Sequence, residues 1–241
     1  MKIILRAAFF CSFAAITSNT WADDDLLMAK CPSLKVWETA AHARAERQAI
    51  PHGAPTMPAL RAELLAMMGT DQAVRGPMMS GDGHALSTKE LHRMWAVDRH
   101  NLNRFKIIFR RLGMPTITQV GQDGAEAAFL IVQHASDQVF QARALQSMQR
   151  RIEEHEAAPP HYALLLDRVL MFQGKPQRYG SQFKTVDGRN VLEPVEDSMH
   201  LDELRDAMFL PPIEAYACTM RTMYGLPVDL SALGAPPSKQ Q

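Results

Sequence analysis

Side chains that can do acid–base chemistry or bind polar ligands lie inside apolar sequence in two stretches of this chain. The first stretch runs from Gln133 to Asp137, and the second is residues 162–183, with the sequence YALLLDRVLMFQGKPQRYGSQF. A polar group left unpaired in such surroundings costs about 1–3 kcal/mol, so each of these groups needs a partner. The two stretches together therefore define the candidate site.

His134 is the histidine best placed for acid–base chemistry. Its side chain titrates near neutral pH, so it can act as a general base or acid when a carboxylate orients it. The carboxylates that could do so are Asp98, Asp137 and Asp167. The alternative is a hydrogen-bonded core histidine that fixes the packing of helices. The catalytic hypothesis assigns roles to His134, Asp167 and Asp98.

The other polar residues of the two stretches are candidates for binding a polar ligand. Arg168 carries a planar guanidinium that can hold a carboxylate or phosphate through paired hydrogen bonds, or can bridge two helices instead. Amides and hydroxyls beside a glycine can contact a ligand or satisfy helix ends. These further candidates are Gln133, Asp137, Gln177, Tyr179, Ser181 and Gln182.

Metal chemistry and serine chemistry have weaker support in the sequence. His134 with Asp98, Asp137 and Asp167 offers nitrogen and oxygen ligands for zinc or manganese. However, the chain has no HExxH or CxxC motif and no second histidine embedded with them. Ser181 lacks the strand-turn-helix elbow of hydrolase serines. We therefore expect no metal and no cofactor.

The N-terminus has the features of a secretory signal peptide. Two basic residues precede an apolar run at 7–16, and Thr20-Trp21-Ala22 offers small residues for cleavage after Ala22. The apolar run is too short to cross a bilayer. We therefore expect removal of residues 1–22, no stable membrane span, and a mature chain that is periplasmic or secreted.

The charge balance argues against nucleic acid as a partner. The whole chain has 26 Lys+Arg and 26 Asp+Glu. Cleavage would remove two basic residues and no acidic residue, and 26 less 2 leaves 24 basic against 26 acidic residues. Proteins that bind nucleic acid present a basic surface instead. The expected partner is a small polar ligand or a fragment of the cell envelope.

Two cysteines, Cys31 and Cys218, would remain after cleavage, near the two ends of the mature chain. In an oxidising compartment an isolated pair of cysteines is expected to form a disulfide. Two buried thiols are the alternative. A disulfide would join the two ends of the mature chain across a very long loop.

The longest predicted helix covers residues 87–112. Ser87 and Glu90 have the spacing of a capping box at its start, and a glycine and a proline follow its end. Asp98 and Asn101 are three residues apart on this helix, so they share a face close to the apolar stripe.

Two shorter helical patterns bear on the site. Apolar residues at helical spacing predict a helix over residues 59–68, which Gly69 would end. Residues 125–132 are almost entirely apolar and predict a central helix. If that helix continues, it places three polar residues on one side, namely His134, Asp137 and Gln141.

The sum of these patterns predicts a mainly α fold, a single helical domain with one small β-hairpin near residues 181–195. Asp187-Gly188 between two alternating segments is the hairpin signal. The run LLLDRVLMF can be read as a helix or as a strand. The expected segments are a signal peptide at 1–22, a helical extension at 23–58, a helical domain at 59–226 and a disordered tail at 227–241.

The polar motifs of residues 59–226 resemble those of DUF6624, a family of bacterial domains of unknown function. Ser181 stands where the family usually has threonine, and Met220 stands where it has an arginine. The resemblance implies no reaction. It rests on Asp71-Gln72-x-x-Arg75, Asp98-x-x-Asn101, Gly113-Met114-Pro115, Gln133-His134-Ala135-x-Asp137, Leu165-x-Asp167-Arg168 and Gln177-x-Tyr179-Gly180-Ser181-Gln182.

Two functional classes remain open from the sequence. The preferred one is an exported binding or structural module with a polar cleft around His134 and Asp167-Arg168. The other is a metal-independent hydrolase that acts on a cell-envelope peptide or sugar with His134 as general acid or base.

Overall fold

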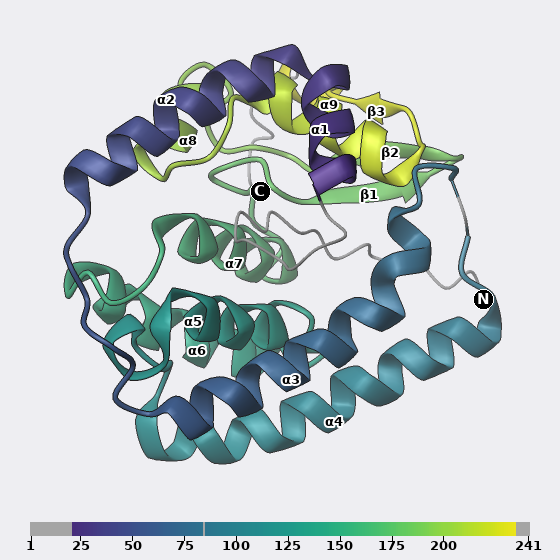
Figure 1. Cartoon of the computed structure of the whole chain (residues 1–241). Helices are drawn as coiled ribbons and strands as arrows, with labels where there is room; N and C mark the ends of the chain where they lie inside the picture. Colours follow the sequence, from purple (N-terminus) through teal and green to yellow (C-terminus); the bar gives the residue numbers. More distant parts are fainter. Residues whose placement is uncertain (1–20, 84, 235–241) are drawn as a thin grey trace.

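A computed structural model describes residues 21–83 and 85–234 (Figure 1). Most of the expected signal peptide and the last part of the expected tail lie outside these residues. The helices are α1 (Trp21–Lys30), α2 (Pro32–Gln48), α3 (Pro58–Arg75), α4 (Thr88–Leu112), α5 (Ile117–Gln133), α6 (Gln138–Glu153), α7 (Pro159–Phe172), α8 (Leu201–Ala207) and α9 (Ile213–Tyr224), with 3-10 turns at η1 (Gly76–Met79) and η2 (Ser231–Gly234).

The helices form a layered arrangement. Figure 1 shows α3 and α4 along one side of the molecule, α5, α6 and α7 beside them, and α2, α9 and the small sheet on the opposite side. The main core lies among α3 to α7, where Leu64, Phe105, Phe129 and Leu165 are fully buried. Because α5 is apolar on most of its surface, it occupies the centre of this core.

Capping boxes fix the starts of two core helices. Ser87 accepts a hydrogen bond from the backbone N–H of Glu90, whose side chain accepts from Ser87, as the sequence predicts for α4. Thr116 and Gln119 form the same reciprocal pair at the start of α5. Within α5, Gly121 adopts a φ of 76° and kinks the helix.

The expected end of α3 at Gly69 is wrong, because the helix continues to Arg75. A glycine inside a helix costs only about 1 kcal/mol relative to alanine, which packing against the core readily offsets. The continuation has a consequence for the site, since it places Asp71 and Arg75 one turn apart on the same buried face.

The ambiguous run LLLDRVLMF lies in a helix, α7. Pro159 and Pro160 occupy the first turn of α7, where a missing N–H breaks no bond. Both Asp167 and Arg168 are buried, at 0% and 5% exposure, so neither of these adjacent side chains points outward. They leave the helix about 100° apart and reach different parts of the structure.

The predicted hairpin consists of β1 (Phe183–Val186) and β2 (Arg189–Leu192), paired antiparallel with Phe183 opposite Leu192. Asp187 and Gly188 both have positive φ, as the tight turn between the strands requires. The mainly α fold with a small β element is therefore confirmed. The structure adds a short parallel strand, β3 (Val228–Asp229), which lies in the segment expected to be a disordered tail.

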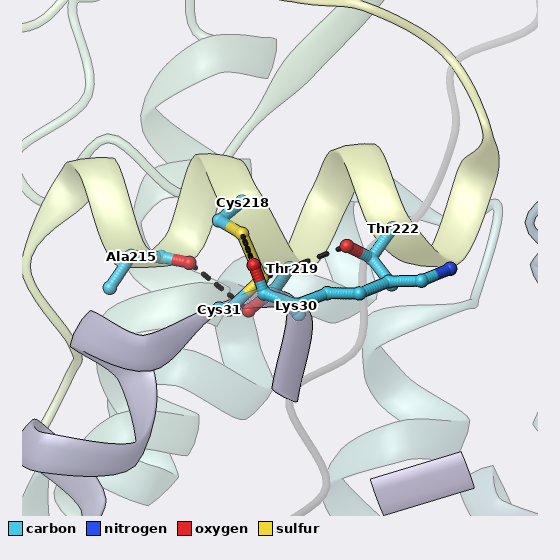
Figure 2. The surroundings of a disulfide bond; sticks show 6 residues. All are labelled: Lys30, Cys31, Ala215, Cys218, Thr219 and Thr222. Carbon is cyan, nitrogen blue, oxygen red and sulfur yellow. Dashed lines mark hydrogen bonds between the residues drawn. A yellow bond between two sulfur atoms is a disulfide. The ribbon is translucent and has the colours of Figure 1, made fainter. Parts of the chain in front are cut away.

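The expected disulfide is present and joins Cys31, at the start of α2, to Cys218 in α9 (Figure 2). The two Cα atoms are 5.9 Å apart, and Leu34 and Ala215 pack around the bridge. At the other end of α2, Arg44 donates to the Asp206 carboxylate at 2.6 Å. The N-terminal extension is therefore attached to the C-terminal part of the domain at two places.

No helix in the described part of the chain is long and apolar enough to span a membrane.

Candidate functional site

The predicted site residues around His134 do not share one helix. α5 ends at Gln133, His134 is its C-cap, and α6 begins after Asp137, which caps it by accepting from the backbone N–H of Phe140 at 2.9 Å. The Gln141 amide nitrogen lies within 3.0–3.2 Å of three carbonyl oxygens, two in the last turn of α5 and one in the turn that follows it. Asp137 and Gln141 therefore shape the turn that presents His134.

The carboxylate that orients His134 is Asp71. The Nδ1 atom of His134 lies 2.9 Å from both carboxylate oxygens of Asp71, and both side chains are only 1% exposed. Asp71 also accepts from Arg75 at 2.7 Å and from Gln72 at 2.7 Å. Arg75 in turn donates to Asp98 at 2.8 Å. We call these four residues, Asp71, Arg75, Asp98 and His134, the His134 network.

The environment of the network sets its protonation. Burial, with the charge of Arg75, lowers the pKa of His134 to about 4, although Asp71 opposes this shift. The imidazole is therefore neutral at pH 7. Because the Asp71 carboxylate can only accept, Nδ1 carries the ring proton and Nε2 is the unprotonated nitrogen. Burial also raises the pKa of Asp98, against the effect of Arg75.

Two further buried residues border the network from other helices. The charge of Arg168, in α7, contributes to the lowered pKa of His134. Tyr224, at the end of α9, lies near both arginines: burial raises its phenol pKa, and Arg75 and Arg168 oppose that rise. Tyr224 was not among the residues predicted for the site. Five helices thus bring polar groups together at this centre.

Asp167 lies apart from this arrangement and binds backbone. Its carboxylate accepts N–H groups of Arg178 at 2.8 Å, Tyr179 at 2.9 Å and Ser181 at 2.9 Å. Burial raises the pKa of Asp167, and the three N–H groups oppose that rise. Asp167 therefore acts as an anchor for the turn after α7.

The side-chain amides in the turn after α7 also hydrogen-bond to other groups of the protein. Gln177 donates to the carbonyls of Gln182 at 3.0 Å and Glu193 at 2.8 Å, and accepts from the N–H of Gln182 at 2.8 Å. The Gln182 amide donates to the hydroxyl of Ser181 at 2.9 Å. The polar cluster at 177–182 thus connects α7 to the β-hairpin.

Gln133 differs from these residues. Its side chain is fully buried, and no described residue hydrogen-bonds either end of its amide. An unsatisfied buried amide costs about 1–3 kcal/mol, so it marks a place where a bound group would be favoured. Of the predicted ligand-binding residues, Gln133 therefore keeps the strongest case for direct contact with a ligand.

The burial of His134 predicts acid sensitivity. In the unfolded chain its pKa is 6.5, against about 4 in the fold, so stability is complete above pH 6.5 and is lost as pH falls toward 4. The loss at pH 4 that is due to His134 should be about 3 kcal/mol. Urea unfolding of wild type and His134→Gln at pH 7 and pH 4 measures it as the difference between the two proteins, because buried His161 adds its own loss in both. His134→Gln should flatten this dependence, whereas His42→Gln, at an exposed position, should leave it unchanged; equal slopes in all three proteins would contradict the assignment.

A cavity of about 420 Å³ lies elsewhere, between the end of α2 and the starts of α5 and α7. This volume is in the range of small-molecule sites, which are mostly apolar with a few polar groups. Its apolar wall includes Ala45, Ile50, Ile117, Ala125, Ile152, Pro159, Pro160, Phe209, Leu210 and Pro211. Its polar residues are Gln48, His52, Gln122, Glu126, His155 and His161.

Two lining residues have positive φ because each follows a helix end. His155 and Phe209 have φ values of 58° and 54°, and the other positive-φ residue besides glycine in the described chain is Asp187, in the hairpin turn. His155 follows the C-cap of α6 and Phe209 follows the C-cap of α8, and paired backbone hydrogen bonds close each of these helix ends as a Schellman motif. The positive φ values are therefore part of two helix ends that border the cavity.

The cavity wall also holds a neutral histidine. His161 stacks on Phe129 with ring centroids 4.4 Å apart and planes 3° from parallel. Burial lowers the pKa of His161 to about 4, so its ring is uncharged at pH 7. Glu126, on α5, is 7% exposed and contributes a carboxyl group to the same wall.

Comparison with known proteins identifies a family and no activity. A family model with the description "Family of unknown function (DUF6624)" matches residues 58–229. No curated protein and no solved structure gives a significant match. Within residues 21–83 and 85–234, no three His, Cys, Asp or Glu side chains are grouped so that they could hold a metal ion. A functional assignment therefore depends on the geometry of this chain.

Proposed function

We propose that this chain, which belongs to the DUF6624 family, is an exported binding module that holds a small ligand in the cavity between α2 and the starts of α5 and α7. The observation that carries the proposal is the cavity itself, with a volume of about 420 Å³ and a largely apolar wall that includes a few polar residues. The signal-like N-terminus and the Cys31–Cys218 disulfide support export, since disulfides persist in oxidising compartments.

In this proposal the His134 network is the structural centre of the module. Its residues come from α3, α4 and the end of α5, and each carboxylate in it is bonded to a buried partner. Asp167 and Gln177 do the same for the turn after α7. The predicted polar residues thus hold α3, α4 and α5 together and fix the turn after α7, and α5 and α7 also line the cavity.

A thermal-shift screen of the mature, oxidised protein tests the cavity. The screen compares wild type with Ala45→Trp, which would fill the cavity from α2, and with Ala40→Trp, an exposed position on the same helix outside the lining. Compounds that bind in the cavity should raise the melting temperature of wild type and Ala40→Trp by several degrees. They should have no effect on Ala45→Trp.

Two results of this screen would contradict the proposal. If hits stabilise all three proteins equally, the ligand binds outside the cavity. If no compound from a broad set of amines, acids, sugars and peptides stabilises wild type, the cavity is not a ligand site.

A second candidate function is a metal-independent hydrolase of a cell-envelope peptide or sugar. The contact between Asp71 and His134 favours it, because it fixes the ring tautomer and leaves Nε2 as the basic nitrogen. Mass spectrometry of envelope fragments incubated with the protein tests it. Cleavage by wild type and none by a folded His134→Gln variant would support the hydrolase, and the absence of cleavage would reject it.

A further inference from the structure

We infer that the outer face of α4 binds the surface of an anionic phospholipid bilayer. The inference concerns a different part of the molecule from the cavity and does not depend on the proposed ligand site. α4 carries seven lysines and arginines but only two acidic residues, whereas the whole chain has 26 of each kind. In a chain whose charge is balanced overall, one helix with this excess gives the molecule a basic side.

The two acidic residues of α4 do not neutralise this side. Asp98 faces inward, where it accepts from Arg75 at 2.8 Å, and its side chain is 12% exposed. Glu90 lies at the start of the helix and accepts from the backbone N–H of Ser87 at 2.8 Å and from its hydroxyl at 2.7 Å. Both carboxylates are therefore already bonded within the protein.

Two of the basic residues of α4 have acidic partners as well. Arg104 pairs with Glu63 of α3, and Lys106 donates to Asp137 at 2.6 Å. The other five are exposed, and no ion pair or side-chain hydrogen bond joins them to another residue within 21–83 and 85–234, namely Lys89, Arg93, Arg99, Arg110 and Arg111. Because successive residues of a helix are 100° apart, these five project within about 120° of one another, on the side opposite the buried Phe105.

The basic face is accessible over the whole length of α4. The helix has 25 residues, which makes it about 37 Å long. Figure 1 shows that it forms an outer edge of the molecule, with the other helices on one side of it. A row of cations of this length reaches several lipid headgroups at once, and each Lys or Arg near an anionic bilayer strengthens binding roughly fivefold.

Exposed apolar side chains on the same helix favour a bilayer over other polyanions. Ile107 lies within the basic face and is 42% exposed, and Trp95 borders that face and is 44% exposed. Helices that lie on a membrane combine Lys and Arg with residues of these kinds, and Trp is enriched where headgroups meet acyl chains. The phosphate backbone of a nucleic acid has no such apolar layer. The face therefore matches a surface that is anionic outside and apolar beneath.

Vesicle sedimentation with the mature, oxidised protein tests the partner. Vesicles of phosphatidylcholine alone are compared with vesicles of equimolar phosphatidylcholine and phosphatidylglycerol, each at low and at high salt. The protein should sediment with the anionic vesicles at low salt and remain in solution with the neutral ones. Binding should weaken about tenfold or more at high salt, because ions screen the attraction between the cations and the headgroups.

Two variants that lose the same charge test the face. The α4 variant combines Arg93→Gln, Arg99→Gln and Arg110→Gln. The control variant combines, at exposed positions outside α4, Lys35→Gln, Arg47→Gln and Lys175→Gln. The α4 variant should bind anionic vesicles about a hundredfold more weakly, whereas the control should bind as wild type does. Exposed substitutions change stability little, and circular dichroism checks the fold. If the α4 variant fails to fold, Arg99→Gln alone should still weaken binding about fivefold.

Three results would overturn the inference. Equal binding to neutral and anionic vesicles, or binding to neither, would show that the protein does not recognise the charge of the headgroups. An equal loss of binding in the two variants would place the contact outside α4. If duplex DNA at the same phosphate concentration displaces the protein from anionic vesicles, the face recognises a nucleic acid instead of a bilayer.

Discussion

Replacement of Asp71 by alanine is expected to lower the free energy of unfolding by about 3–5 kcal/mol, because it breaks a buried ion pair from one side. The substitution removes the carboxylate that Arg75 and His134 both contact and leaves a buried guanidinium with Asp98 as its remaining acidic contact. Urea unfolding of the mature, oxidised protein, followed by circular dichroism, measures the change. A loss of this size is a large fraction of the stability of a typical domain.

Asp123 provides the matched control. It forms an ion pair with Arg61, but the two side chains are 36% and 42% exposed. Solvent screens such a pair, so Asp123→Ala should cost about 1 kcal/mol or less. If Asp71→Ala costs no more than Asp123→Ala, the His134 network does not hold the helices together, and its burial would need another explanation.

Local signals in the sequence predicted local structure well. Ser87 and Glu90 determine the start of α4 through contacts within one helical turn, and Asp187-Gly188 determines the hairpin through two backbone conformations. Such features depend on neighbours in the chain, so they can be predicted without the tertiary structure. The disulfide was also predictable, because only two cysteines would remain after cleavage.

The network could not be derived in the same way. Asp71 and His134 are 63 residues apart, and which carboxylate meets the histidine depends on how α3 packs against α5. The expected stop at Gly69 concealed the spacing of four between Asp71 and Arg75, which would have indicated a paired face on one helix. Asp98, a predicted catalytic residue, accepts from Arg75, whereas the carboxylate beside Nδ1 of His134 is that of Asp71.

The cavity had no sequence signal at all. Its wall comes from α2, α5, α6, α7 and the segment before α9, so no single stretch contains a motif. Most of the predicted site residues are buried polar side chains at the centre of the fold, whereas the cavity lies where the N-terminal extension meets the domain.

The disulfide attaches the N-terminal extension to the domain and is expected to be the second large determinant of stability. Cys31 and Cys218 are 187 residues apart, and a cross-link across so long a loop is worth about 5 kcal/mol in the chain-entropy model. We expect a loss of that size in a Cys31→Ser, Cys218→Ser double variant, measured by urea unfolding. Wild type in reductant should match the double variant, and the double variant itself should not respond to reductant.

Removal of the disulfide should also weaken ligand binding in the cavity. α2 contributes Ala45, Gln48 and Ala49 to the wall. Without the disulfide, the described ion pair between α2 and the C-terminal part of the domain is that of Arg44 with Asp206, and the Asp206 side chain is 59% exposed. An exposed pair of this kind contributes about 1 kcal/mol at most. Compounds that bind oxidised wild type in the cavity should therefore bind the reduced protein far more weakly, even where circular dichroism shows that the helices of residues 58–229 persist. Unchanged binding after reduction would show that α2 does not depend on the disulfide, and that the bridge stabilises the chain without shaping the site.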